Sequence, residues 1–90
     1  MASAKKSSPP PSLSLRERDV AFGKALRRFR LRQVLTQEQL AWAVEMSRVY
    51  LSNIERGRKE PCLGTIFKLA SALGIPAAEL IAETERLLQR

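Results

Sequence analysis

The sequence contains no histidine and only one cysteine, Cys62. These absences exclude a Cys–His nucleophile pair, a structural zinc site of the usual ligand set and an internal disulfide bond. No carboxylates, lysines or serines are grouped in a catalytic arrangement. We therefore expect a binding module without a cofactor or metal, not an enzyme. A lone thiol also fits a reducing compartment, most simply the cytoplasm.

Long hydrophobic runs are also missing. No apolar run approaches the roughly 18–20 residues that span a bilayer. The N-terminus has no apolar stretch of signal-peptide length, so no secretory signal is expected. Hydrophobic residues make up 44% and charged residues 28% of the 90 residues, which is the composition of one small globular domain.

Negative charge is scarce relative to positive charge. Sixteen Lys and Arg residues against nine Asp and Glu residues give a net charge of +7. Such an excess on a short chain indicates a polyanionic partner, nucleic acid first and an anionic membrane surface second. A membrane-surface protein would carry its basic residues on one helix with an apolar face. Here they are spread over several predicted elements, which favours nucleic acid.

The first twelve residues differ in composition from the rest. The segment MASAKKSSPPPS has three consecutive prolines and almost nothing to bury, so we expect residues 1–12 to form a disordered basic tail. Lys5 and Lys6 are either solvated or reach a phosphate. Residues 13–90 are expected to form the folded domain.

Apolar side chains at helical spacing predict five helices in that domain. Phe22, Leu26 and Phe29 form one such stripe on the first helix, and the later segments repeat the pattern. We expect helices at residues 13–33, 37–44, 49–56, 63–73 and 76–88. No segment alternates with a period of two. The expected fold class is therefore all-α, a compact bundle with short loops.

Polar residues and glycines mark the predicted helix ends. Ser14 with Glu17, and Thr36 with Gln39, have the spacing of capping boxes. Ser47 is the candidate N-cap of the third helix. Gly57 and Gly74 follow the third and fourth helices, where a glycine ends a helix in left-handed geometry.

The second and third predicted helices form a helix-turn-helix. Only about three residues separate them, so they must cross steeply instead of packing antiparallel. Apolar or small residues occupy the positions that would line their shared core, namely Leu40, Ala41, Val44, Met46, Leu51 and Ile54. The outward face of the third helix is left with Arg48, Val49, Ser52 and Asn53.

Residues 22–81 resemble the Cro and lambda-repressor type (XRE family) of helix-turn-helix regulators. The matching text is GKALRRFRLRQVLTQEQLA, SRVYLSNIERGRKEP and LGTIFKLASALGIPAAELI. The fragment SRVYLSNIERG is also similar to controller proteins of restriction–modification systems. The resemblance implies a five-helix lambda-repressor-like DNA-binding domain.

Two positions depart from the family pattern, which usually has glycine at both. Glu45 lies at the tight turn between helices two and three, where left-handed geometry would cost on the order of 1 kcal/mol. Val34 follows the first helix. Because a β-branched residue resists left-handed geometry more strongly, we expect no glycine-type cap there.

The resemblance also implies how the protein contacts DNA. The third helix would lie in the major groove, with Arg48, Val49 and Asn53 reading bases and Ser52 nearby. Arg48 offers a guanidinium fork to guanine, Val49 suits a thymine methyl group, and Asn53 suits adenine. The implied phosphate contacts are Gln37, Ser47, Tyr50, Arg56, Arg58 and Lys59. Gln37 could also brace Arg48, and the alternative for Arg58 and Lys59 is a solvated loop.

Two further positions have structural interpretations. Relatives join an Arg near the end of helix one to a Glu near the end of helix three, which implies a salt bridge between Arg30 and Glu55. Trp42 follows the buried position Ala41. We expect it to pack against the first helix, with a partner chain or DNA sugars as the alternative contact.

Family members commonly bind palindromic operators as dimers, since one recognition helix reads too few base pairs to be specific. The candidate interface is the apolar stripe of the last helix, with help from the fourth helix, and its residues are Leu80, Ile81, Thr84, Leu87 and Leu88. The alternative is that Leu80 and Ile81 close the core of the single chain.

The predicted function is a small dimeric repressor or autoregulator, bacterial or phage-encoded, that binds a specific double-stranded DNA sequence in the cytoplasm. The alternative is the antitoxin of a toxin–antitoxin pair, which would bind a protein toxin as well as DNA.

Overall fold

The computed structural model describes residues 15–89, and in this range the chain is all-α, as predicted. The helices are α2 (Leu15–Arg32), α3 (Gln37–Ala43), α4 (Arg48–Glu55), α5 (Leu63–Leu73) and α6 (Ala77–Leu88). The tail expected at residues 1–12 and the Ser14 cap lie outside the described residues.

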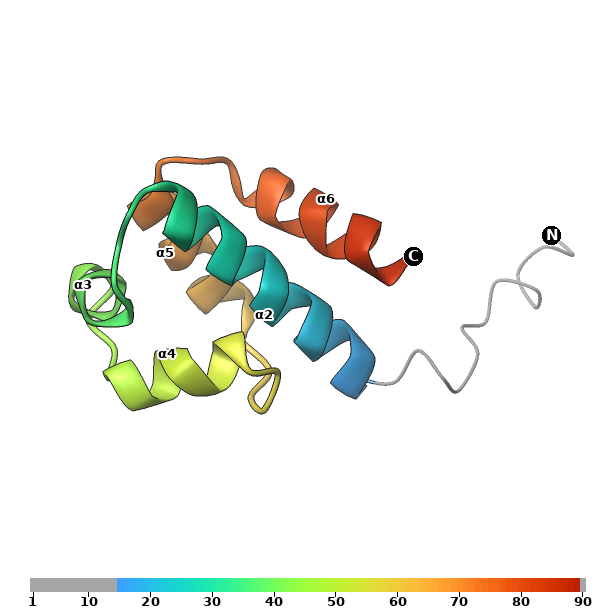
Figure 1. Ribbon diagram of the computed structural model, residues 1–90, viewed down its shortest axis with the longest axis horizontal. Coiled ribbons are helices and arrows are strands. Elements are labelled where there is room, and N and C mark those ends of the chain that lie inside the picture. The colour runs from blue at the N-terminus through green and yellow to red at the C-terminus, as the bar shows by residue number, and fades with distance from the viewer. Residues whose placement is uncertain (1–14, 90) are drawn as a thin grey trace, which may run out of the picture.

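The longest helix, α2, lies between α4 and α6. Figure 1 shows α4 and α6 on opposite sides of α2, and α2 packs against both of them. Helix α3 packs against α4 and α5, and α5 also packs against α6. Within residues 15–89, no single helix is long and apolar enough to cross a membrane. Helices α5 and α6 reach that length only as a pair bent by 106°.

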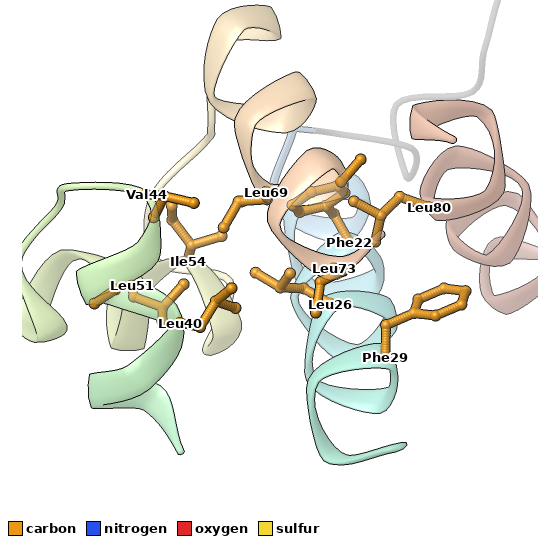
Figure 2. Close-up of a cluster of buried hydrophobic side chains, with 12 residues drawn as sticks. Phe22, Leu26, Phe29, Leu40, Val44, Leu51, Ile54, Leu69, Leu73 and Leu80 are labelled. Atoms are coloured by element: carbon orange, nitrogen blue, oxygen red, sulfur yellow. The ribbon is translucent and has the colours of Figure 1, made fainter. Parts of the chain in front are cut away.

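A single hydrophobic core joins all five helices. Side chains from each of them meet in Figure 2. Fully buried members include Leu26, Leu40, Leu51, Ile54, Leu69, Leu73 and Leu80. These residues lie on the predicted stripes, so the hydrophobic pattern of the sequence located the core.

Both N-caps of the helix-turn-helix are formed as predicted. The Thr36 hydroxyl accepts a hydrogen bond from the Gln39 backbone N–H, while the Gln39 side chain accepts one from the Thr36 N–H. The Ser47 hydroxyl accepts a hydrogen bond from the Tyr50 N–H. These bonds satisfy backbone donors that the first turns of α3 and α4 leave free.

Helices α2 to α5 all end in the same type of turn. Each is followed by a residue with positive φ, in chain order Val34 (58°), Glu45 (57°), Gly57 (77°) and Gly74 (71°). In each turn the N–H of that residue and the next N–H donate to carbonyls in the last turn of the helix, which is the Schellman arrangement. Glu45 therefore adopts the left-handed conformation considered for it.

The prediction for Val34 was wrong. The Val34 N–H donates to the Leu31 carbonyl (2.9 Å) and the Leu35 N–H to the Arg30 carbonyl (3.2 Å), so α2 ends in a glycine-type cap without glycine. The Val34 side chain is 86% exposed and gains almost no burial in return. Interactions of the neighbouring residues must hold this turn.

Leu35 provides these interactions. Its side chain packs against the hydrophobic core, and its carbonyl accepts a hydrogen bond of 2.7 Å from Nη1 of Arg30. The next residue, Thr36, caps α3. Because the residues after Val34 are fixed by packing, hydrogen bonding and capping, Val34 adopts the left-handed conformation despite its branched side chain.

The buried ion pair Arg30–Glu55 joins the ends of α2 and α4. Arg30 donates from Nε to Oε2 of Glu55 (2.6 Å) and from Nη2 to Oε1 (2.9 Å). The two side chains are only 7% and 3% exposed. The Gln37 side chain, at the start of α3, donates to the same carboxylate (3.0 Å). One carboxylate therefore contacts α2 and α3 from the end of α4.

Gly23 makes the close approach of α2 to α4 possible. A Cβ atom at Gly23 would lie 2.4 Å from the Glu55 carbonyl oxygen and 2.5 Å from that of Ile54. No larger residue fits at this crossing without moving one helix.

We expect Val34→Gly to raise the free energy of unfolding by about 0.5–1 kcal/mol, because it removes left-handed strain that exceeds the added entropy of the unfolded chain. Val49→Gly is the matched control, since Val49 is also exposed but helical. It should lower the free energy of unfolding by about 0.5 kcal/mol. Urea denaturation followed by circular dichroism measures both. A loss of stability in Val34→Gly equal to that of the control would contradict the assigned strain.

We expect Glu55→Gln to lower the free energy of unfolding by about 3–5 kcal/mol, because it leaves the Arg30 charge buried without a counter-ion. Glu60→Gln is the control. Glu60 forms an ion pair with Arg18 whose side chains are 51% and 49% exposed, and its loss should cost less than about 1 kcal/mol. Denaturation at neutral pH distinguishes the two, and similar small losses in both variants would show that the buried pair is dispensable.

Candidate nucleic-acid interface

Helix α4 divides its side chains between the core and the surface. Leu51, Ile54 and Glu55 are buried, which anchors the inner face of the helix. At its N-terminal end, Arg48 and Val49 are exposed, and Val49 is 61% accessible. An exposed first turn on an anchored helix can insert into a groove without disturbing the core.

The predicted base-reading residues lie on this outer face. Arg48 and Val49 occupy the first turn, and Ser52 and Asn53 are half-buried in the following turn. No ion pair to Arg48 is formed within residues 15–89. Its guanidinium group is thus available to a ligand.

Gln37 lies beside Arg48. Both residues line an open depression between the end of α2 and the starts of α3 and α4, together with the exposed Leu31 and Val34. The Gln37 side chain does not brace Arg48 in this structure. It donates its hydrogen bond to Glu55 instead, so the buried ion pair orients the first residue of α3.

The predicted phosphate-contacting residues differ in how firmly they are held. Ser47 is exposed but its oxygen already accepts the Tyr50 N–H. Tyr50 is half-buried and packs against the core. Arg56, Arg58 and Lys59 are exposed at the end of α4 and in the loop that follows. The positively charged side chains at the C-terminal end of α4 and in the following loop therefore lie on the surface, where they can bind an anion.

Two of the five residues expected at a dimer interface belong to the interior of the single chain. Leu80 is fully buried, and Thr84 is 5% exposed with its hydroxyl donating to the Leu80 carbonyl (2.8 Å). Ile81 is 39% exposed, and Leu87 and Leu88 are half-buried. The stripe of α6 thus serves largely to cover α2, and the interface prediction is corrected for Leu80 and Thr84.

Glu83 adds a polar link between α6 and α2. Its carboxylate is 7% exposed and pairs with Arg28 of α2 and with Arg86 of α6. The hydrogen bond from Arg86, with a further one from Arg28, holds the pKa of Glu83 below its usual value of 4.5. These two ion pairs of Glu83 are another reason why this face of α6 makes its contacts within the chain.

The expected packing of Trp42 against the first helix was wrong. Its side chain is 85% exposed on α3, beside shallow depressions lined by residues such as Glu38 and Met46. Since Leu40 and Ala41 turn inward, the next position on the helix turns outward.

Among residues 15–89, no group of three potential metal-ligating side chains occurs.

Comparisons with known proteins agree with this geometry. The model of a family described as "Helix-turn-helix domain" matches residues 21–82. An uncharacterized HTH-type transcriptional regulator of Sinorhizobium fredii is 40% identical over 70% of this chain and 82% of that protein. The immunity repressor protein of Bacillus phage phi105 is 41% identical over 71% of this chain and 44% of that protein.

A solved structure shows the same fold. The restriction-modification controller protein C.AhdI from Aeromonas hydrophila superimposes with a TM-score of 0.68 at 42% identity, over 69% of this chain and 94% of that chain. The residues matched by the family model, 21–82, contain the helix-turn-helix of α3 and α4, including the exposed turn of α4. The chain therefore belongs to the helix-turn-helix family of DNA-binding transcriptional regulators.

Proposed function

We propose that the protein acts in the cytoplasm as a small repressor or autoregulator that binds a palindromic operator as a homodimer, with α4 of each copy in the major groove. The observation that carries this proposal is the exposed turn of Arg48 and Val49 on a helix that the core anchors through Leu51 and Ile54. A rigid support is needed because base edges are read only when donors are held in register.

Arg48 is the central base-reading residue in this proposal. Two of its three guanidinium nitrogens can donate to O6 and N7 of guanine in the major groove. Val49 can make apolar contact with a thymine methyl group, and Asn53 can pair with adenine from the next turn of α4. Ser52 lies between them on the helix and contacts the same groove.

The surrounding polar residues would bind the DNA backbone. Gln37, held by Glu55, contacts a phosphate from the start of α3 on one side of the groove, with Ser47 and Tyr50 near the start of α4. Arg56, Arg58 and Lys59 contact phosphates at the other end of α4. These contacts fix the orientation of α4 but carry no sequence information.

The homodimer follows from the small size of this reading surface. One recognition helix covers too few base pairs to select a single operator among the competing sites of a genome. Two copies related by a two-fold axis read two half-sites about one helical turn apart. The relatives named above are a transcriptional regulator, a repressor and a controller protein, and nothing among them supports the antitoxin alternative.

We expect Arg48→Ala to lose about 1–3 kcal/mol of operator binding and to relax preference at one base pair of each half-site. The operator is first selected from a pool of random DNA, and its two-fold symmetry tests the proposed dimer. Fluorescence anisotropy then measures affinity for the operator and for each single-base variant.

Arg58→Ala is the matched control, another exposed arginine that the proposal assigns to phosphate. It should weaken binding to all sequences alike and reduce the slope of log affinity against log salt by about two units, one for each copy of the dimer. If Arg48→Ala keeps full discrimination at every operator position, Arg48 is not a base-reading residue.

A further inference from the structure

The second half of α2 carries an uninterrupted run of positive charge. No acidic residue occurs between Asp19 and Glu38. Within that interval, residues 24–32 contain five basic side chains, namely Lys24, Arg27, Arg28, Arg30 and Arg32. The positive charge of this stretch therefore has to be balanced by groups from elsewhere.

Three of the five basic side chains have partners within the chain. Arg28 and Arg30 form ion pairs with carboxylates of α6 and α4. Arg32 lies over the aromatic ring three residues before it, 5.1 Å from the ring centroid. Lys24 and Arg27 are exposed, and neither forms an ion pair within residues 15–89. These two charges remain available to a ligand.

Local electrostatics of the helix do not account for Lys24 and Arg27. The helix dipole favours positive charge only in the last turn, where the basic residues are Arg30 and Arg32. Lys24 lies three residues before Arg27 and four before Arg28, and like charges at these spacings repel each other. Neutral side chains at both positions would make α2 more stable by itself. An anionic ligand outside the chain accounts for the two charges.

Arg27 lies on the side of α2 that faces α4. Positions 23, 27 and 31 are spaced by four residues and so form one row along α2. At one end of this row, a Cβ atom at Gly23 would lie 2.4 Å from the carbonyl oxygen of Glu55, at the end of α4. At the other end, Leu31 lines the open depression that also contains Arg48, at the start of α4. Arg27 lies between these two points and therefore runs alongside the proposed reading helix.

The depression beside Arg27 combines apolar and basic groups. Its exposed apolar residues are Leu31 (50%) and Val34 (86%). The DNA backbone alternates phosphate groups with sugars, which present apolar faces, so it matches such a surface. Glu38 of α3 lines the same depression, and its negative charge disfavours a phosphate there. The phosphate is therefore expected at the α2 end, next to Arg27.

We propose that this side of α2 binds the sugar-phosphate backbone of duplex DNA beside the bases that α4 reads. We call it the flank surface and define it as Lys24, Arg27, Leu31 and Val34. The inference rests on the proposed DNA-binding function and adds to it a backbone-binding site outside the helix-turn-helix.

The width of the major groove favours DNA as the occupant of the flank surface. The groove is about 12 Å wide, and a helix with its side chains is about 10–12 Å across. Helix α4 would therefore fill the groove, and the backbones that border the groove would lie beside the helices that flank α4. Helices α2 and α3 both pack against α4. Gln37 is the proposed phosphate contact from α3, and Arg27 provides the corresponding contact from α2.

DNA binding by charge variants of α2 tests the proposal, with the operator selected as described above. Arg27→Gln and Lys24→Gln should each weaken operator binding about three- to tenfold and reduce the slope of log affinity against log salt by about two units, one for each copy of the dimer. The loss should be equal for the operator and its single-base variants, because phosphate contacts carry no sequence information. Lys68→Gln is the matched control. Lys68 is an exposed lysine of α5 without an ion pair within residues 15–89, and its loss should change affinity by less than about twofold.

A neutral methylphosphonate placed at single positions of the operator locates the contact. Replacing the phosphate that Arg27 binds should weaken binding by wild-type protein about three- to tenfold. The same replacement should cost Arg27→Gln less than about twofold, because the interaction is already absent. The melting temperature of free Arg27→Gln should rise or stay unchanged, since a like-charge repulsion is removed. Weaker DNA binding by an equally stable protein would not result from damage to the fold.

Other outcomes separate this inference from the proposed function. If Arg27→Gln and Lys24→Gln bind the operator as well as Lys68→Gln does, the flank surface does not contact DNA, and base reading by α4 is unaffected. A loss in Arg27→Gln that is confined to particular base pairs also overturns the backbone contact and assigns Arg27 to base reading. A wild-type chain that selects no DNA sequence overturns the proposed function, and this inference with it.

Discussion

The ion pair between Arg30 and Glu55 is the constraint on which the DNA-binding geometry depends. It is almost completely buried, so neither charge can exchange its partner for water. Through Arg30 it also holds the Leu35 carbonyl, and through Glu55 it holds the Gln37 side chain. The hydrogen bonds of this ion pair thereby fix the end of α2, the start of α3 and the end of α4 relative to one another. The angle at which α4 presents Arg48 is consequently a property of the fold, set before DNA binds.

Much of this fold could be predicted from the sequence because its determinants are local. Thr36 and Ser47 cap helices through atoms within three residues, and a stripe such as Phe22, Leu26 and Phe29 is read directly from helical periodicity. The conformation of Val34 could not be predicted in this way. Its own preference opposes left-handed geometry, and the interactions that override it come from Arg30, the core contacts of Leu35 and the cap of α3. Local propensity yields to tertiary structure at this residue.

The candidate surfaces, too, could be predicted from the sequence only in part. Alternation of buried and exposed positions on α4 placed Arg48 and Asn53 on the outer face, since Leu51 and Ile54 fix the inner one. The apolar stripe of α6 was harder to interpret, because periodicity does not tell whether a stripe covers its own chain or another. Here Leu80 and Thr84 cover α2. Glycines are equally ambiguous in sequence. Gly23 and Gly64 both lie within helices, and only the position of the α4 carbonyls distinguishes a required glycine from one without an internal contact.

The connection between α4 and α5 is held against α2. Gly57 has positive φ, and a Cβ atom there would lie 2.6 Å from a methyl carbon of Val20 on α2, so the loop leaves α4 in a fixed direction against α2. The Arg18–Glu60 ion pair also joins α2 to this loop. The position of α5 relative to α4 is thus set by packing within one chain. In the proposed homodimer, a fixed position of α4 within each chain makes half-site spacing part of operator specificity without any further base contact.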